Sequence, residues 1–266
     1  MATALKLLER REEAEGQPEA VCPFFVFDVE TMNPPPELME RLEKEFLAEW
    51  EPPGNMKDEE KINLRKQADL EKFRERAALH DEAPVSLVGL MFESRTYLLH
   101  GLKATKAKWF GKRENNVSIE GFKNERELME AVYATLDEKT SERMQGVAHN
   151  CFGFDLSKLR LAGVRHGLVL PEALRVVMDE EEDRRRFVDT MSLFCKYFSK
   201  RGELFIKQES MLERLGLPAL LKGVATGADV PKLLAEKPPR INEVATKLLA
   251  DLCGCRDAYL RMTQRG

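Results

Sequence analysis

The sequence predicts an α/β protein with a mixed sheet flanked by helices, on the basis of two observations. Short, strongly apolar segments typical of strands come first in the chain. Segments with apolar residues at helical spacing then alternate with further strands and dominate the C-terminal end, an order typical of α/β folds. With 266 residues the chain is long enough for a sizeable core. Its net charge of −4 means that any contact with nucleic acid must be local.

The first elements are a strand and two helices. We predict a strand over residues 21–30 (VCPFFVFDVE), which ends before the three prolines of 34–36 because proline cannot continue a strand ladder. Apolar residues at helical spacing then predict helices over 36–50 and 57–80. We therefore expect residues 34–84 to form a helical insertion between the first strand and the rest of the sheet.

The remaining elements follow the same reasoning from apolar periodicity and turn residues. They are a hairpin of strands over 85–92 and 95–102, a helix over 124–139 capped by Asn124, a strand over 144–150, a helix beginning within 152–167, a strand-to-helix passage over 186–194, helical segments over 209–217 and 230–237, and a terminal helix over 242–264. We expect residues 1–20 to be a tail and residues 21–266 to be one domain.

The cysteines and the absence of long apolar runs indicate in which cellular compartment the protein is expected. The five cysteines are odd in number and scattered, and no CxxC pair occurs, which argues against a disulfide framework and for a reducing cytosol. No apolar run approaches the ~20 residues of a membrane helix, and the first residues do not have the pattern of a secretory signal. We expect a cytoplasmic protein with no membrane partner.

Two acidic residues, Asp28 and Glu30, end the most apolar segment of the chain, FFVF at 24–27. Since side chains alternate across a strand, both carboxylates should point to one face, with Cα atoms ~6.5 Å apart. Such a pair suits two hard cations ~3.5–4 Å apart, a geometry used to cleave phosphodiesters. A solvated strand end is the competing interpretation when the pair is considered alone.

Two further acids lie in patterned segments. Asp155 opens a predicted helix within GVAHNCFGFDLSKL (146–159), and Asp257 lies on the terminal helix within LLADLCGCRDAYL (248–260). An acid in the first turn of a helix is also favoured by the helix dipole. Each acid is therefore compatible with a structural role when it is considered alone.

Taken together, the acidic segments resemble a known family. FDVET (27–31), HNCFGFDLSKL (149–159) and CGCRDAYL (253–260) are similar, in this order, to the three motifs of the DEDD-type 3′–5′ exonucleases of the ribonuclease H-like superfamily. The closer likeness is to phage and bacterial exonucleases related to the proofreading domain of family B polymerases, and it extends over residues 22–260. It implies a ribonuclease H-like sheet and removal of nucleotides from single-stranded 3′ ends, DNA rather than RNA.

The resemblance also implies roles for individual residues. Four acids would form the catalytic centre and hold two Mg²⁺ or Mn²⁺ ions, namely Asp28, Glu30, Asp155 and Asp257. Five residues would bind the single strand, namely Thr31, Met32, His149, Asn150 and Phe154. A base stacked on the Phe154 ring would gain ~1–3 kcal/mol, and packing in the core is an equal alternative for that ring.

One position departs from the family pattern. The family has a tyrosine four residues before its last acid, or a histidine five before, which orients or deprotonates the attacking water. These positions are Cys253 and Leu252 here. A thiol could act as a base if its pKa were lowered, so we retain Cys253 as a catalytic candidate. Two alternatives stay open: a nucleic-acid-binding protein that has lost efficient hydrolysis, and an accessory protein whose insertion docks a polymerase or repair partner.

Overall fold

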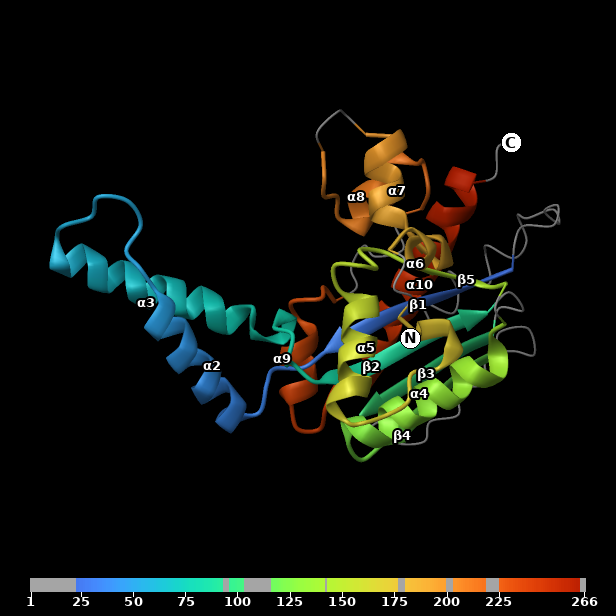
Figure 1. The fold of residues 1–266 in the computed structure, drawn as a ribbon, viewed down its shortest axis with the longest axis horizontal. Coiled ribbons are helices and arrows are strands. Elements are labelled where there is room, and N and C mark those ends of the chain that lie inside the picture. Colours follow the sequence, from blue (N-terminus) through green and yellow to red (C-terminus); the bar gives the residue numbers. More distant parts are fainter. Residues whose placement is uncertain are drawn as a thin grey trace.

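The computed structural model describes residues 23–92, 96–102, 116–141, 143–176, 180–199, 203–218 and 225–263. These residues form a mixed six-stranded sheet with helices on both faces (Figure 1). The strands lie in the order β4-β3-β2-β1-β5-β6, with the bounds β1 Phe24–Thr31, β2 Val85–Phe92, β3 Thr96–Leu102, β4 Asn116–Phe122, β5 Gln145–Ala148 and β6 Phe187–Asp189. The predicted α/β class is confirmed, and the sheet is consistent with a ribonuclease H-like fold.

The helices cover the sheet unequally. Helices α4 and α5 pack on one face, and α10 covers the other, where it contacts β1, β2 and β5. The helices have the bounds α2 Pro36–Glu49, α3 Glu59–Glu75, α4 Glu125–Lys139, α5 Asp155–Arg165, α6 Glu180–Arg186, α7 Thr190–Tyr197, α8 Gln208–Arg214, α9 Val230–Ala235 and α10 Ile241–Thr263. Among these helices none combines the length and apolar character that crossing a bilayer requires.

Strand β1 lies inside the sheet, antiparallel to β2 and parallel to β5. Its side chains alternate between the two cores: Phe25 and Phe27 pack with the residues of α4 and α5, whereas Phe24 and Val26 pack with those of α10. The next even positions are Asp28 and Glu30, and both carboxylates lie near residues of α10. The alternation along β1 therefore directs the two acids toward this helix.

Helix α10 approaches the sheet closely at Gly89 of β2. A Cβ atom built on this glycine would lie 2.8 Å from Cδ1 of Leu252 and 2.9 Å from Cδ2 of Leu248. Real Cβ atoms do not reach such distances, so a larger residue here would displace the leucines or the helix. Because Gly89 has no side chain, α10 can lie this close to β1 and β2.

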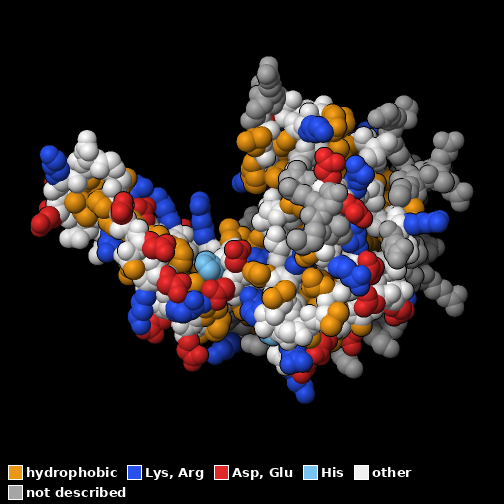
Figure 2. Space-filling view, viewed as in Figure 1, with side chains coloured by type: hydrophobic (Ala, Val, Ile, Leu, Met, Phe, Trp, Pro, Cys, Tyr) orange, Lys and Arg blue, Asp and Glu red, His pale blue; other side chains and the backbone are white. Residues whose placement is uncertain are grey.

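Helices α2 and α3 lie between β1 and β2 in the chain and project away from the sheet as a two-helix arm (residues 36–75, Figure 1). The rings of Phe46 and Phe73 stack with centroids 4.8 Å apart, and Arg74 donates two hydrogen bonds of 2.7 Å to the carboxylate of Glu43. Acidic and basic side chains alternate over the surface of the arm (Figure 2). The contacts that join the two helices therefore include this aromatic stack, the ion pair of Arg74 with Glu43, and a hydrogen bond of 3.3 Å from Nε1 of Trp50 to Asp69.

Several sequence predictions differ from the structure in detail. The helix expected over 57–80 is shorter: Asp58 caps the start of α3 by accepting from the N–H groups of Glu60 and Lys61, and after Glu75 the chain turns into a short 3-10 helix over Ala77–Leu79. Strand β4 was not predicted, although Val117 and Ile119 alternate into the core. The expected tail over residues 1–20 lies outside the described residues.

Candidate metal centre

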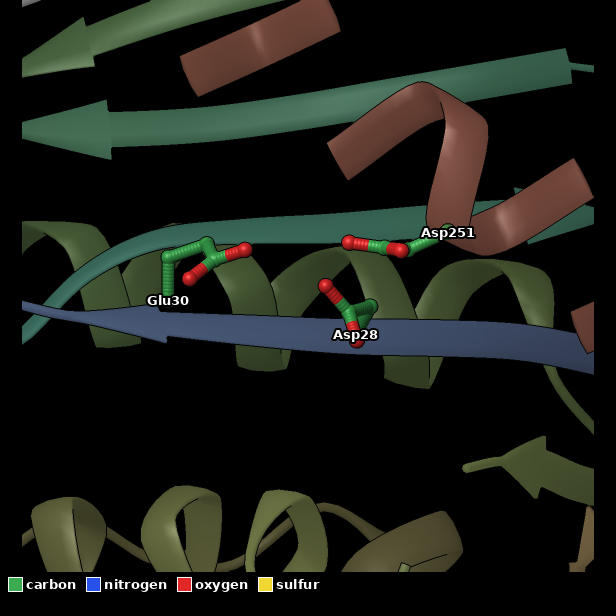
Figure 3. Close-up of side chains that lie close together, drawn as sticks. All are labelled: Asp28, Glu30 and Asp251. Atoms are coloured by element: carbon green, nitrogen blue, oxygen red, sulfur yellow. The ribbon is translucent and has the colours of Figure 1, made fainter. Parts of the chain in front are cut away.

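Three carboxylates converge between β1 and α10. Asp28 and Glu30 come from β1 and Asp251 comes from α10, and each offers one oxygen such that the three oxygens lie within 4.8 Å of one another (Figure 3). Glu30 and Asp251 are each only 6% exposed. Segments more than 200 residues apart in the chain are brought together here by the packing of α10 on the sheet.

Lys247 lies one helical turn before Asp251 and contacts the same group of acids. Its Nζ forms an ion pair of 2.5 Å with Oδ2 of Asp251 and a second ion pair with Oε1 of Glu30. The lysine side chain is 12% exposed, so the pairs are shielded from water. Buried ion pairs of this kind hold their partners firmly, because removing one charge leaves the other uncompensated.

Asp155 is the first residue of α5 and lies near Asp28 and Glu30 of β1. Its Oδ1 accepts a hydrogen bond of 2.9 Å from the backbone N–H of Val29. This N–H is available because β5 pairs with β1 only as far as Val26, which leaves the later part of β1 without a strand on that side. Asp155 satisfies the unpaired edge of β1 and brings a fourth acidic group near Asp28 and Glu30.

Burial and mutual repulsion shift the protonation of the centre. Burial raises the pKa of the Asp28 carboxyl well above its usual range, and the charges of Asp251 and Asp155 add to this. Burial also raises the pKa values of Glu30 and Asp155. Burial alone would lower the pKa of Lys247, but the charges of Glu30, Asp251 and Asp28 outweigh it and raise that pKa well above its usual value.

One oxygen of the centre lacks a hydrogen-bond partner. Oδ2 of Asp28 is buried, and no hydrogen bond reaches it from the described residues. A buried carboxylate oxygen without a partner is costly. Hard carboxylate oxygens are the ligands that Mg²⁺ and Mn²⁺ prefer, so Asp28, Glu30 and Asp251, with Asp155 beside them, have the donor set that such an ion requires.

The acid that α10 brings to Asp28 and Glu30 is Asp251, not the Asp257 that we expected. Six residues along an α-helix correspond to about 9 Å along the axis and about 120° around it, so the two acids cannot occupy one place. Asp257 is buried elsewhere and accepts a hydrogen bond of 3.2 Å from Nη1 of Arg256. Cys253 likewise faces the sheet, where its Sγ lies 3.7 Å from Oη of Tyr97.

Thr31 and Met32, two of the residues expected to bind nucleic acid, form hydrogen bonds to neighbouring segments of the chain. Thr31 Oγ1 donates to the carbonyl of Ala78, and Met32 N donates to that of Pro84 and borders a small pocket with Ile241. These contacts fix the chain where β1 leads into the arm.

His149, Asn150 and Phe154 lie between β5 and α5. Both ring nitrogens of His149 have partners, at 3.1 Å from Oγ1 of Thr190 and 2.9 Å from the carbonyl of Ile206. Asn150 has a positive φ of 61° and donates its N–H to Asp189, which also caps α7. Phe154 precedes α5, and Nζ of Lys158 lies 5.4 Å from the centroid of its ring. His149 and Asn150 therefore stabilise the turn that presents Asp155.

Sequence reasoning missed Asp251 and Lys247. The signal was present as a lysine and an acid at i and i+4, which lie on one face of a helix. It was obscured because Asp257 also follows apolar neighbours at helical spacing. Only the packing of α10 decides which of its acids faces β1.

Comparisons with known proteins bear on the fold alone. No family model and no curated protein sequence matches the chain. Among solved structures, the chain is similar to the family B DNA polymerase from the hyperthermophilic archaeon Pyrobaculum calidifontis, with a TM-score of 0.51 and 12% sequence identity. The match covers 92% of this chain and 25% of the polymerase chain, so this chain spans a quarter of that protein's length. Its fold is therefore one that recurs within a family B DNA polymerase.

Proposed function

We propose that this protein is a metal-dependent 3′–5′ exonuclease that removes nucleotides from single-stranded 3′ ends, DNA rather than RNA. The observation that supports it best is the convergence of Asp28, Glu30 and Asp251, together with the buried Oδ2 of Asp28, which has no hydrogen-bond partner among the described residues. The fold, shared with part of a family B DNA polymerase, makes this chemistry reasonable, although fold alone never decides function.

Four acids of the chain have roles in this proposal. Asp28, Glu30 and Asp251 would hold Mg²⁺ or Mn²⁺, and Asp155 would add negative charge beside them and keep β1 in place through Val29. Divalent ions bound here would lower the pKa of a water and neutralise charge on the phosphate. Because carboxylates repel an anionic substrate, a phosphate would approach this centre only when cations are bound.

A second candidate function is supported by Lys247. In the family that the sequence resembles, a tyrosine stands four residues before the last acid. If Asp251 is that acid, the corresponding residue is Lys247, whose ammonium pairs with Glu30 and Asp251. An ammonium compensates the acids without activating water. A nucleic-acid-binding protein with weak or no hydrolysis is therefore the alternative.

The two functions can be separated with a 5′-labelled single-stranded DNA oligonucleotide and its RNA counterpart. With Mg²⁺ or Mn²⁺ we expect wild-type protein to produce a ladder shortened from the 3′ end, faster on DNA. Asp28→Asn should reduce the rate at least about 100-fold, as the loss of a metal-holding group does, whereas Leu64→Ala on the exposed face of α3 should leave it unchanged.

Equal rates for wild type and Asp28→Asn would overturn the nuclease proposal, since they would reveal a contaminating activity. Binding of the oligonucleotide by fluorescence anisotropy, with no shortening over a range of Mn²⁺ concentrations, would favour the binding protein. If the protein neither binds nor shortens the oligonucleotide, both functions are excluded.

A further inference from the structure

Lys247 occupies a place in the centre that a cation would otherwise take. Its Nζ lies between two carboxylates that come from different elements, Glu30 on β1 and Asp251 on α10. Metal ions bridge carboxylates in the same manner, with oxygen ligands 2.0–2.6 Å away for Mg²⁺ and Ca²⁺ as general values. The ammonium is therefore positioned as the bridge between strand and helix.

The four acids near Lys247 fall into two groups, those that form an ion pair with the lysine and those that do not. The ammonium pairs with Glu30 and Asp251, whereas the buried Oδ2 of Asp28 has no hydrogen-bond partner among the described residues. Asp155 lies near Asp28, and its Oδ1 is held by Val29. Among the described residues, the lysine thus forms ion pairs with two of the acids, whereas Asp28 and Asp155 are affected by its charge without an ion pair to it.

We propose that Lys247 serves as a built-in cation, so that the centre takes one divalent ion, at Asp28, instead of two. This inference rests on the proposed function, because it assumes that the acids bind metal. Glu30 and Asp251 each give one oxygen to the lysine, so the space between these oxygens is closed to a second ion. Their other oxygens join Asp28 around the single ion. The ammonium supplies positive charge next to the bound phosphate but has no site at which water can be activated.

The proposal is tested by counting the Mn²⁺ ions that one chain binds. Free Mn²⁺ is measured from its EPR signal during titration of the full-length protein, without nucleic acid. We expect one ion for wild type and two for Lys247→Met, which keeps the length of the side chain but removes the charge. Lys44→Met, an exposed lysine of α2 that pairs with Glu40, is the matched control and should bind one.

Thermal unfolding in EDTA gives an independent readout. Lys247→Met leaves Glu30 and Asp251 without their cation, so its Tm should fall by about 5 °C or more, and Mn²⁺ should restore it. Lys44→Met should unfold at the wild-type temperature. If Lys247→Met does not fold, Lys247→Gln replaces it, and two ions bound to wild type would by themselves overturn the proposal.

The outcomes separate this inference from the proposed function. Two ions bound to wild type, or one ion still bound to Lys247→Met, would overturn the built-in cation and leave the nuclease proposal standing. No Mn²⁺ bound to either protein would overturn both. One ion in wild type that is lost in Asp28→Asn, with two in Lys247→Met, is the result that we expect.

Discussion

Gly89 of β2 lies directly opposite Asp28 of β1 in their antiparallel pairing. Residues opposite each other in a sheet share a face, and a Cβ on Gly89 would collide with Leu248 and Leu252 of α10. The glycine therefore allows α10 to lie close to the sheet at the level of Asp28, and Asp251 reaches the acid as a result.

A larger residue at this position should loosen the metal centre. Gly89→Ala is expected to cost about 1–3 kcal/mol of folding free energy by overpacking and to weaken Mn²⁺ binding about 10-fold, because α10 must move outward. Chemical unfolding and Mn²⁺ titration measure the two effects. Val88→Ala provides the control, since Val88 packs on the opposite face of the sheet. It should lose comparable stability by leaving a cavity and keep its Mn²⁺ affinity; a parallel loss of affinity there would refute the role of Gly89.

The two acids of α10 permit a direct comparison of the assignments. Asp251→Asn should reduce Mn²⁺ affinity at least about 100-fold, because Asp251 belongs to the converging group of acids. Asp257→Asn should retain wild-type affinity, since its carboxylate pairs with Arg256 instead. Because Asp251→Asn also removes a buried partner of Lys247, the stability of both variants is measured beside their affinity. Loss of binding in Asp257→Asn with binding retained in Asp251→Asn would instead make Asp257 the metal-holding acid of α10, as the family resemblance implies.

Much of the fold, but less of the metal centre, could be predicted from the sequence. The apolar run before Asp28 predicted a central strand, and its alternation predicted that Asp28 and Glu30 share a face; both carboxylates lie in the group that converges with Asp251. These inferences succeed because they depend on the two-residue period of a strand. Asn124 was also predicted correctly as a cap, and its Oδ1 accepts the N–H of Glu127.

The choice among the acids of α10 could not be predicted in the same way. Its residues are buried on several sides, by the sheet, by α8 and by α9, so helical periodicity marks no single functional face. Motif spacing favoured Asp257, but the rotation of α10 is set by contacts such as Leu248 against Gly89, which are remote in sequence. Tertiary packing therefore decides which acid of α10 joins Asp28 and Glu30.

His100 should make the protein sensitive to acid. Burial lowers its pKa to about 4, whereas an unfolded histidine titrates near ~6.5. The unfolded state then binds more protons, so the stability contributed by neutral His100 is present above pH ~6.5 and lost as the pH falls toward ~4. At pH 5 the loss amounts to about 2 kcal/mol. Urea unfolding of wild type and His100→Leu at pH 7 and pH 5 measures it.

The variant isolates this histidine from the other groups that titrate. Because leucine has no proton to bind, His100→Leu should lose about 2 kcal/mol less than wild type between pH 7 and pH 5. An equal loss in the two proteins would mean that His100 stays neutral in both states or is accessible to protons when folded.

The two-helix arm should unfold independently of the sheet. Its helices are joined by the stack of Phe46 on Phe73 and by the partly exposed ion pair of Arg74 with Glu43, and ion pairs near the surface contribute little. Phe73→Ala removes that stack, so we expect limited proteolysis within residues 36–75 to accelerate about 10-fold, as expected when a partly buried aromatic contact of about 1–2 kcal/mol is lost. The Tm of the sheet should fall by less than about 2 °C, since the arm's ring contact lies outside its core. Leu64→Ala on the exposed side of α3 should behave as wild type. A cooperative loss of the whole fold in Phe73→Ala would show instead that the arm and the sheet form one folding unit.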